Sequence, residues 1–144
     1  MKKEVKIILN HNDESLAPIR KDGDVGFDLK SIEDKSINPG SVELINCGFK
    51  MEMPDNFEAQ IRPRSGLALK YHVTVLNTPG TVDPSYRGDI CVILINQGSE
   101  TFNIKRGDRI AQMIFNKVEL PELKIVSQLT ETERGEGGFG STGI

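Results

Sequence analysis

The stretch GFKMEMPDNFEAQIR, residues 48–62, alternates apolar and polar side chains on both sides of a central turn signal. Alternation with a period of two places one set of side chains on each face of an extended strand, so it predicts half-buried β-strands. Pro-Asp-Asn at 54–56 favours a turn between two such strands. The apolar side chains that share one face of each strand are those of Phe49, Met51, Met53, Phe57, Ala59 and Ile61.

The same two signals recur along most of the chain. Strand patterns occupy residues 4–10, 72–77, 89–96 and 109–115, and Gly- or Pro-containing turn signals separate them. Residues 89–96, DICVILIN, are apolar on both faces, which is typical of a doubly buried strand. The one helix candidate is SGLALKY, residues 65–71. We therefore expect an all-β fold, a jelly-roll-like β-sandwich with at most one short helix.

Length and composition limit the classes of protein and partner. The 144 residues suit one domain, which we expect at residues 1–130, followed by a flexible Gly-rich arm at 131–144. A net charge of −3 argues against a nucleic-acid polymer as partner. The N-terminal apolar run, Ile-Ile-Leu, is too short for a signal peptide or a membrane span. Cys47 and Cys91 have no CxxC spacing and are expected to be reduced thiols in a cytoplasmic protein.

The stretch NTPGTVDPSYRGDI, residues 77–90, is the densest group of polar and turn-forming residues between two apolar strands. Asp83 has two interpretations that the spacing leaves open. It can cap a type I turn that has Pro84 at its second position. It can also act as a general base that orients a water molecule, a role that typically contributes about 10²–10⁴-fold to a rate.

Three further stretches offer polar groups with similar alternatives. Arg64, Ser65 and Gly66 lead into the helix candidate, where free N–H groups attract anions, although Ser65 can also be a simple N-cap. Asp28, close to Gly26, can hold a hydrated Mg²⁺ or serve a turn. Gln112 lies in an apolar strand and needs a partner if it is buried, either backbone or ligand.

The end of the chain, RGEGGFGSTG at 134–143, is either a solvated tail or a binding loop. Consecutive N–H groups in Gly-rich turns form concave anion-binding nests. Arg134 adds a charge, and Phe139 can stack on a base. Composition alone favours a tail.

Taken together and in this order, the stretches resemble the five motifs of the trimeric deoxyuridine triphosphatase (dUTPase) family. They read VGFDLKS (25–31), PRSGLA (63–68), NTPGTVDPSYRGDI (77–90), GDRIAQMIF (107–115) and RGEGGFGSTG (134–143). The resemblance implies a jelly-roll subunit in a homotrimer, with each active site between subunits and closed by a C-terminal arm. It implies hydrolysis of dUTP to dUMP and pyrophosphate with Mg²⁺, which limits uracil in DNA and supplies dUMP for thymidylate synthesis.

The resemblance also implies a role for each matching residue. Asp83 corresponds to the aspartate that holds the attacking water. Asn77 and the backbone of Gly80, Thr81, Val82 and Asp83 correspond to the hairpin that binds uracil. Tyr86 corresponds to the ring under the deoxyribose, where a 2′-OH would clash, and Cys91 lies on the strand beside the pocket.

The remaining matches concern the phosphates, the metal and the arm. Arg64, Ser65, Gly66 and Gln112 correspond to phosphate contacts, and Asp28 to an aspartate that reaches Mg²⁺ through water. In the arm, Arg134 corresponds to the γ-phosphate arginine and Phe139 to the lid over uracil. The phosphate-binding turn corresponds to Gly140, Ser141 and Thr142.

One position departs from the family pattern, since Val25 stands where alanine is usual before the glycine of the first motif. Two other functions are compatible with the fold. A dCTP deaminase would need a glutamate base, but Asp83 stands at the water-activating position. A non-catalytic nucleotide-binding trimer would not need Asp83, Arg134 and Phe139.

Overall fold

The alternating stretch at 48–62 forms two strands that belong to different sheets. In the computed structural model, which describes residues 3–144, β5 (Phe49–Glu52) pairs with β1 (Lys6–Leu9). The next strand, β6 (Phe57–Arg62), pairs instead with β8 (Gly80–Val82) and β11 (Arg109–Lys117). The turn signal at 54–56 therefore carries the chain from one sheet to another.

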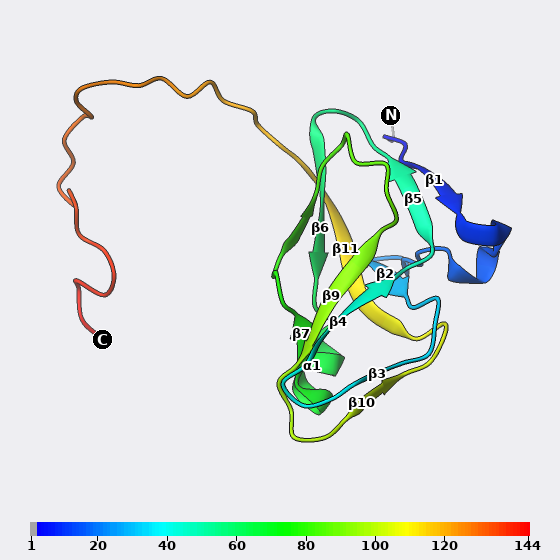
Figure 1. The fold of residues 1–144 in the computed structure, drawn as a ribbon. Helices are drawn as coiled ribbons and strands as arrows, with labels where there is room; N and C mark the ends of the chain where they lie inside the picture. The colour runs from blue at the N-terminus through cyan, green and yellow to red at the C-terminus, as the bar shows by residue number, and fades with distance from the viewer. Residues whose placement is uncertain (1–2) are drawn as a thin grey trace.

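All strand pairings are antiparallel, and the prediction of an all-β, jelly-roll-like fold is confirmed (Figure 1). A four-stranded sheet has the order β2-β11-β6-β8, and a three-stranded sheet has the order β4-β9-β7. Two strand pairs, β1-β5 and β10-β3, complete the body. The bounds of the remaining elements are Asn10–Asn12 (η1), Glu14–Leu16 (η2), Phe27–Lys30 (β2), Lys35–Ile37 (β3), Val42–Asn46 (β4), Ser65–Tyr71 (α1), Val73–Val75 (β7), Cys91–Asn96 (β9) and Phe102–Ile104 (β10).

The sheets enclose one apolar core, because the inward side chains of each strand are the apolar members of the alternation. The largest fully buried side chains come from several sheets and include Phe49, Leu29, Ile45, Leu94 and Met113. Asn96, at the end of β9, is one of two buried polar residues within residues 3–144, the other being Ser31. Its amide donates to the carbonyl oxygens of Ile37 (2.9 Å) and Glu100 (2.7 Å), so its burial leaves no hydrogen bond unmade.

The predicted helix at 65–71 is present as α1, with those bounds. Ser65 is its first residue and not its N-cap, so that alternative interpretation of Ser65 is wrong. Arg64 is the N-cap, in extended conformation (φ −92°, ψ 131°), and its side chain makes no capping hydrogen bond. The first turn of α1 therefore presents N–H groups that no capping side chain occupies.

The prediction of a doubly buried strand at 89–96 holds for one face of β9 only. Val92, Leu94 and Asn96 are buried, whereas Ile93 and Ile95 on the other face are partly exposed. Their neighbours across the ladders, Leu44 on β4 and Leu76 after β7, are 58% and 50% exposed. The outer face of the β4-β9-β7 sheet, formed by Val42, Leu44, Leu76, Ile93 and Ile95, is thus apolar and is here called the outer apolar face.

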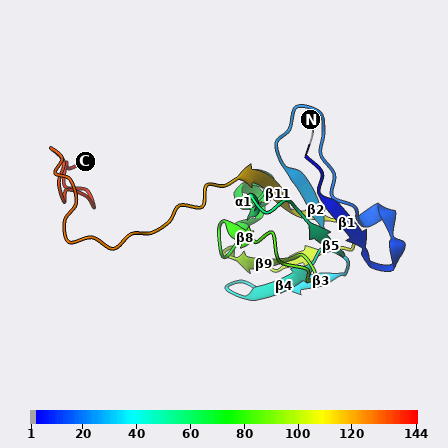
Figure 2. The same ribbon diagram turned by 90° about the horizontal axis from the view of Figure 1, so that it is seen from above.

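The chain leaves the body where β11 ends at Lys117, earlier than residue 131, where the sequence predicts the arm to begin. Residues 118–144 contain no strand or helix and extend away from the sheets, as both views show (Figures 1 and 2). We call residues 118–144 the extended arm. No helix within residues 3–144 combines the length and apolar character needed to cross a membrane.

Candidate functional site

Every site residue predicted between 77 and 91 lines one cavity of about 210 Å³. The cavity lies beside the loop between β7 and β8 and the turn between β8 and β9, with the outer apolar face at its edge. The sequence-predicted members of its lining are Asn77, Gly80, Thr81, Val82, Asp83, Tyr86 and Cys91. The sequence did not predict Leu44, Ile61 and Asp89, which also line it.

The hairpin is tight because Gly80 is buried against two neighbours. A Cβ at this position would lie 3.3 Å from Asn77 Nδ2 and 3.4 Å from Ile61 Cβ, closer than most carbon contacts allow. Gly80 also pairs with Ile61 in the β6–β8 ladder, and a cis peptide joins Thr78 to Pro79. The glycine therefore lets the backbone of β8 approach Asn77 and narrow the cavity.

Asp83 and Tyr86 are held by a short turn. The Tyr86 N–H donates to the carbonyl oxygen of Asp83 (3.1 Å), and the Tyr86 hydroxyl donates to the carbonyl oxygen of Asp89 (2.9 Å). The side chain of Asp83 is exposed, and that of Tyr86 is 47% exposed. The backbone bond thus fixes the turn on which both side chains stand, and the hydroxyl bond adds a second contact for Tyr86.

Cys91 lies on the wall of the cavity, and Cys47 is buried in the core. Neither forms a disulfide within residues 3–144, as predicted. Partial burial, and secondarily the nearby carboxylate of Asp89, raise the pKa of the Cys91 thiol. The Cys91 side chain is therefore a neutral thiol at neutral pH and not a nucleophilic thiolate.

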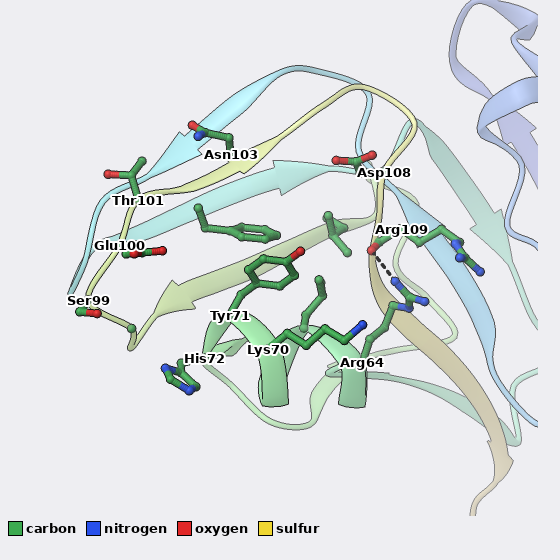
Figure 3. A pocket seen from close by; sticks show the side chains of 14 residues that line it. Arg64, Lys70, Tyr71, His72, Ser99, Glu100, Thr101, Asn103, Asp108 and Arg109 are labelled. Atoms are coloured by element: carbon green, nitrogen blue, oxygen red, sulfur yellow. Dashed lines mark hydrogen bonds between the residues drawn. The ribbon is translucent and has the colours of Figure 1, made fainter.

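A second cluster of predicted residues forms around Asp28, on the opposite edge of the four-stranded sheet from β8. Arg64 Nε lies 3.5 Å from Asp28 Oδ1, and Arg109 Nη1 lies 3.1 Å from Asp28 Oδ2. Arg64 Nη1 also donates to the carbonyl oxygen of Arg109 (2.9 Å), the bond drawn in Figure 3. One carboxylate thus holds two guanidinium groups at the end of β6 and the start of β11.

Gln112 is positioned beside this cluster by the ladder that pairs it with Asp28. Its Nε2 donates to the carbonyl oxygen of Pro63 (3.0 Å), just before Arg64. A Cβ on Gly26 would lie 3.3 Å from both Cβ and Cδ of Gln112, so the glycine of the first motif makes room for that side chain. The partner of Gln112 in this chain is backbone, which is one of the two alternatives that the sequence left open.

Ser65 and Gly66 lie in the exposed first turn of α1, directly after Arg64. A Cβ on Gly66 would meet no atom within 4 Å, so the backbone here is open to an approaching group. Within residues 3–144, no group of three or more His, Cys, Asp or Glu side chains is arranged to hold a metal ion. The Asp28 cluster consequently combines one carboxylate with cationic side chains and free N–H groups, a combination suited to phosphates.

A larger hollow of about 550 Å³ lies between α1 and the segment that leads into β10 (Figure 3). Arg64 and Arg109 lie at one end, so the hollow adjoins the Asp28 cluster. The rings of Tyr71 and Phe102 pack in its middle with centroids 5.2 Å apart. The sequence predicts no role for this region apart from that of Arg64.

The predicted residues of the C-terminal arm are not brought to either cluster of the same chain. Their segment lies in the extended arm, far from the sheets in both views (Figures 1 and 2). Within it, Arg134 Nε donates to the carbonyl oxygen of Gly137 (2.9 Å), and Phe139 is fully exposed with φ 52°. The arm residues for which the sequence predicts a role are Arg134, Phe139, Gly140, Ser141 and Thr142.

Comparison with known proteins agrees with the resemblance of the five sequence motifs to the dUTPase family. The family model described as dUTPase matches residues 12–143. A deoxyuridine 5′-triphosphate nucleotidohydrolase of Alkaliphilus metalliredigens is 53% identical over 140 residues, covering 97% of each chain. The protein of the same name from Clostridium tetani is 53% identical over 139 residues, covering 96% of each. The chain belongs to the dUTPase family.

Solved structures support the same fold at lower identity. The dUTPase of Staphylococcus bacteriophage 80alpha, solved with dUPNHPP, superposes with a TM-score of 0.90. It is 24% identical and covers 99% of this chain and 100% of its own. The extended arm is included in that coverage, so the likeness in fold is not confined to the body.

The dUTPase motifs contain functional candidates that sequence reasoning did not select. Arg109 lies inside the fourth motif, one residue before the strand turns apolar, and contacts Asp28 across the β2–β11 ladder. Arg87 lies inside the third motif and contacts the turn that holds Asp83 and Tyr86. The available signal was an arginine inside a motif, directly after Tyr86 in the case of Arg87 and three residues before Gln112 in the case of Arg109.

Proposed function

We propose that this chain hydrolyses dUTP to dUMP and pyrophosphate, with Mg²⁺, at sites shared between the subunits of a homotrimer in the cytoplasm. This reaction limits uracil incorporation into DNA and supplies dUMP for thymidylate synthesis. The observation that carries the proposal is the single narrow cavity lined by every candidate between residues 77 and 91. The family and its curated members supply the substrate class.

The cavity fits the base and sugar of a deoxynucleotide. Asn77 and the backbone of residues 80–83 bind uracil, and the hairpin excludes a 5-methyl group. The close approach of Gly80 to Asn77, which makes the hairpin tight, supports this role. The Tyr86 ring packs under the deoxyribose and excludes a 2′-OH. A site that excludes a group sterically and bonds the polar edge of its ligand gains discrimination from both effects.

Asp83 acts as the general base. Its exposed carboxylate accepts a proton from a water molecule, whose oxygen attacks the α-phosphorus while pyrophosphate leaves with the electrons of the broken P–O bond. Arg64, Ser65, Gly66 and Gln112 bind the phosphate oxygens on which negative charge develops. In the complex, Arg64 and Arg109 give up some of their contacts with Asp28 and donate hydrogen bonds to the phosphates instead.

Mg²⁺ supplies charge neutralisation on the triphosphate when it is bound. The residues of this chain fit that role at one position, because each Asp28 oxygen has a single ion-pair contact and keeps a lone pair free for a metal-bound water. The ion, when bound, would be held by the phosphates, and Asp28 would reach it through water. A dUTPase from phage phi11 of S. aureus is described with a structural Mg(II) ion.

Three observations support a trimer with composite sites. The cavity and the Asp28 cluster lie apart in one chain and share no lining residue. The outer apolar face adjoins the cavity through Leu44 and Ile93, and its side chains Leu44 and Leu76 are 58% and 50% exposed, as is typical of an interaction surface. The extended arm reaches away from its own body (Figure 1). A second copy on the outer apolar face would bring its Asp28 cluster to the cavity, and an arm from a third would close it.

The arm then completes the site at residues 131–144. Arg134 binds the γ-phosphate, Phe139 covers uracil, and Gly140, Ser141 and Thr142 bind the phosphates with backbone N–H and hydroxyl groups. Closure excludes water other than the attacking molecule.

The test is a substrate panel with one catalytic variant. We expect the purified protein with Mg²⁺ to release pyrophosphate from dUTP and not from dCTP, dTTP or UTP. Asp83→Asn should abolish turnover while dUTP binding stays within about tenfold, since the base acts on water and not on the bound nucleotide. Asp55→Asn, a carboxylate in the turn between β5 and β6, is the matched control and should keep full activity. Deamination of dCTP, or no turnover of any nucleotide, would overturn the proposed function.

A further inference from the structure

The turn that carries Asp83 and Tyr86 is held from outside by Arg87. Its Nη1 donates to the carbonyl oxygen of Pro84 (2.6 Å) and to that of Tyr86 (3.2 Å). Both carbonyls belong to the short segment between β8 and β9. One guanidinium nitrogen therefore bonds two carbonyls in the part of the segment that carries Asp83 and Tyr86.

The guanidinium is itself anchored to a separate sheet. Arg87 Nη2 donates to Glu52 Oε1 (3.3 Å) at the end of β5, and Glu52 Oε2 lies 3.7 Å from Lys6 Nζ on β1. The turn is thus tied to the β1-β5 sheet, and not only to the strands that flank it. The planar fork of arginine suits this use, because it can hold carbonyls and a carboxylate at fixed directions simultaneously.

Packing alone does not fix the turn. Asp83 is exposed and Tyr86 is 47% exposed, so neither side chain is locked by the core. The side chains of Arg87 and Glu52 are 52% and 53% exposed, and a pair at that exposure contributes little to global stability. The contacts of Arg87 therefore act on the local geometry of the turn. A displacement of a catalytic group by about 1 Å costs on the order of 10²-fold in rate.

We propose that Arg87 is a positioning residue that fixes the turn between β8 and β9, and thereby sets both the turnover of dUTP and the exclusion of ribonucleotides. The inference rests on the proposed function, because it assigns Asp83 to catalysis and Tyr86 to sugar recognition. Arg87 touches neither substrate nor water in this role. Its contacts in residues 3–144 are the two carbonyls and Glu52.

The experiment compares Arg87→Ala, Arg87→Lys and the control Arg106→Ala, measuring kcat and KM for dUTP and for UTP together with the thermal midpoint. Arg106 is a surface arginine of similar exposure that pairs with Asp13, away from the turn. For Arg87→Ala we expect kcat for dUTP to fall about 10–100-fold with a smaller change in KM, by the displacement argument. The preference for dUTP over UTP should fall at least about fivefold, because a displaced Tyr86 ring excludes the 2′-OH of UTP less well.

Arg87→Lys should recover part of both effects, since an ammonium can reach one carbonyl but not all three acceptors. Arg106→Ala should change neither kinetic quantity. An unchanged dUTP/UTP preference in a folded Arg87→Ala protein would overturn the proposal. So would a fall in activity explained entirely by a lower thermal midpoint.

Two further outcomes distinguish a wrong role for Arg87 from a failure of the variant to fold and from a failure of the proposed function. If Arg87→Ala does not fold, Glu52→Gln weakens the same anchor while leaving Arg87 on its carbonyls. It should shift the preference in the same direction by a smaller factor, and no shift would overturn the proposal. If the unaltered protein does not hydrolyse dUTP, the proposed function fails first. If it does and the variants match it, only the role of Arg87 fails.

Discussion

Replacing Gly88 by alanine tests how the cavity excludes a ribonucleotide. A Cβ at Gly88 would lie 2.6 Å from Cζ and 3.0 Å from Cε2 of Tyr86, inside the ring's van der Waals surface. The backbone of Gly88 does not have a positive φ, so alanine meets no conformational penalty there. The change therefore acts on the Tyr86 ring alone, and the ring must move.

The structure indicates where the cost of this movement falls. Tyr86 is 47% exposed, so its ring can rotate toward solvent instead of pushing on the core. What is lost is the hydroxyl bond to Asp89, worth about 1 kcal/mol, which corresponds to about 2–4 °C in the thermal midpoint of a chain of this size. The loss of a steric exclusion is larger in its effect on specificity, because about 1–3 kcal/mol corresponds to roughly 10–200-fold in discrimination.

The assay is the ratio of kcat/KM for dUTP and UTP, measured beside the thermal midpoint. We expect Gly88→Ala to lower the ratio at least about tenfold with a small thermal shift, as the energies above imply. Tyr86→Phe is the matched control, since it removes the same hydroxyl bond but adds no Cβ at position 88 to displace the ring. It should show the thermal shift without the loss of discrimination. An unchanged ratio in Gly88→Ala would refute the argument that the ring position excludes the 2′-OH.

Three other perturbations address the arm, the interface and the N-terminal segment. Deleting residues 134–144 should leave the trimer intact by light scattering but cut dUTP turnover severely, and full activity would show that the arm is dispensable. Leu44→Asp places a charge on the outer apolar face and should yield monomers without dUTP turnover; an active monomer would contradict composite sites. The hydrogen bonds of Ser15, and then the Arg106 guanidinium, lower the pKa of Asp13, so this carboxylate stabilises the fold above its unfolded pKa of about 4. That stabilisation is lost as the pH falls through the lowered folded pKa, and thermal melts of Arg106→Ala should differ from those of the unaltered protein at pH 7 but converge with them in acid.

The strongest local patterns in the sequence predict their elements closely. Alternation at 49–53 and 57–62 becomes β5 and β6, and SGLALKY becomes α1, because each pattern is long enough to establish its own period. The sequence does not predict β3 and β10, since three residues cannot show alternation. These two strands form only because they pair with each other.

Contacts between distant residues could not be predicted in this way. Asp28 and Arg109 are 81 positions apart and meet because β2 and β11 are neighbours in one sheet, which no local signal specifies. The contact of Arg87 with Glu52 spans 35 positions and joins two different sheets. Sequence reasoning proposes the residues that bear the chemistry, whereas the fold decides which side chains contact and orient them.

The extended arm combines local turns with exposed apolar side chains, as the proposed docking on a partner subunit requires. Its backbone closes successive turns, with Gly137 N–H donating to Arg134, Ser141 N–H to Gly138 and Gly143 N–H to Gly140. Such turns reduce the conformational entropy that remains to be lost on docking. Most of its apolar side chains, however, are largely exposed, among them Leu123 (91%) and Leu129 (87%), and Phe139 is fully exposed. Because the turns are formed and the apolar contacts are not, the proposed docking on another subunit, with a nucleotide beneath the arm, would supply the stability that the arm lacks alone.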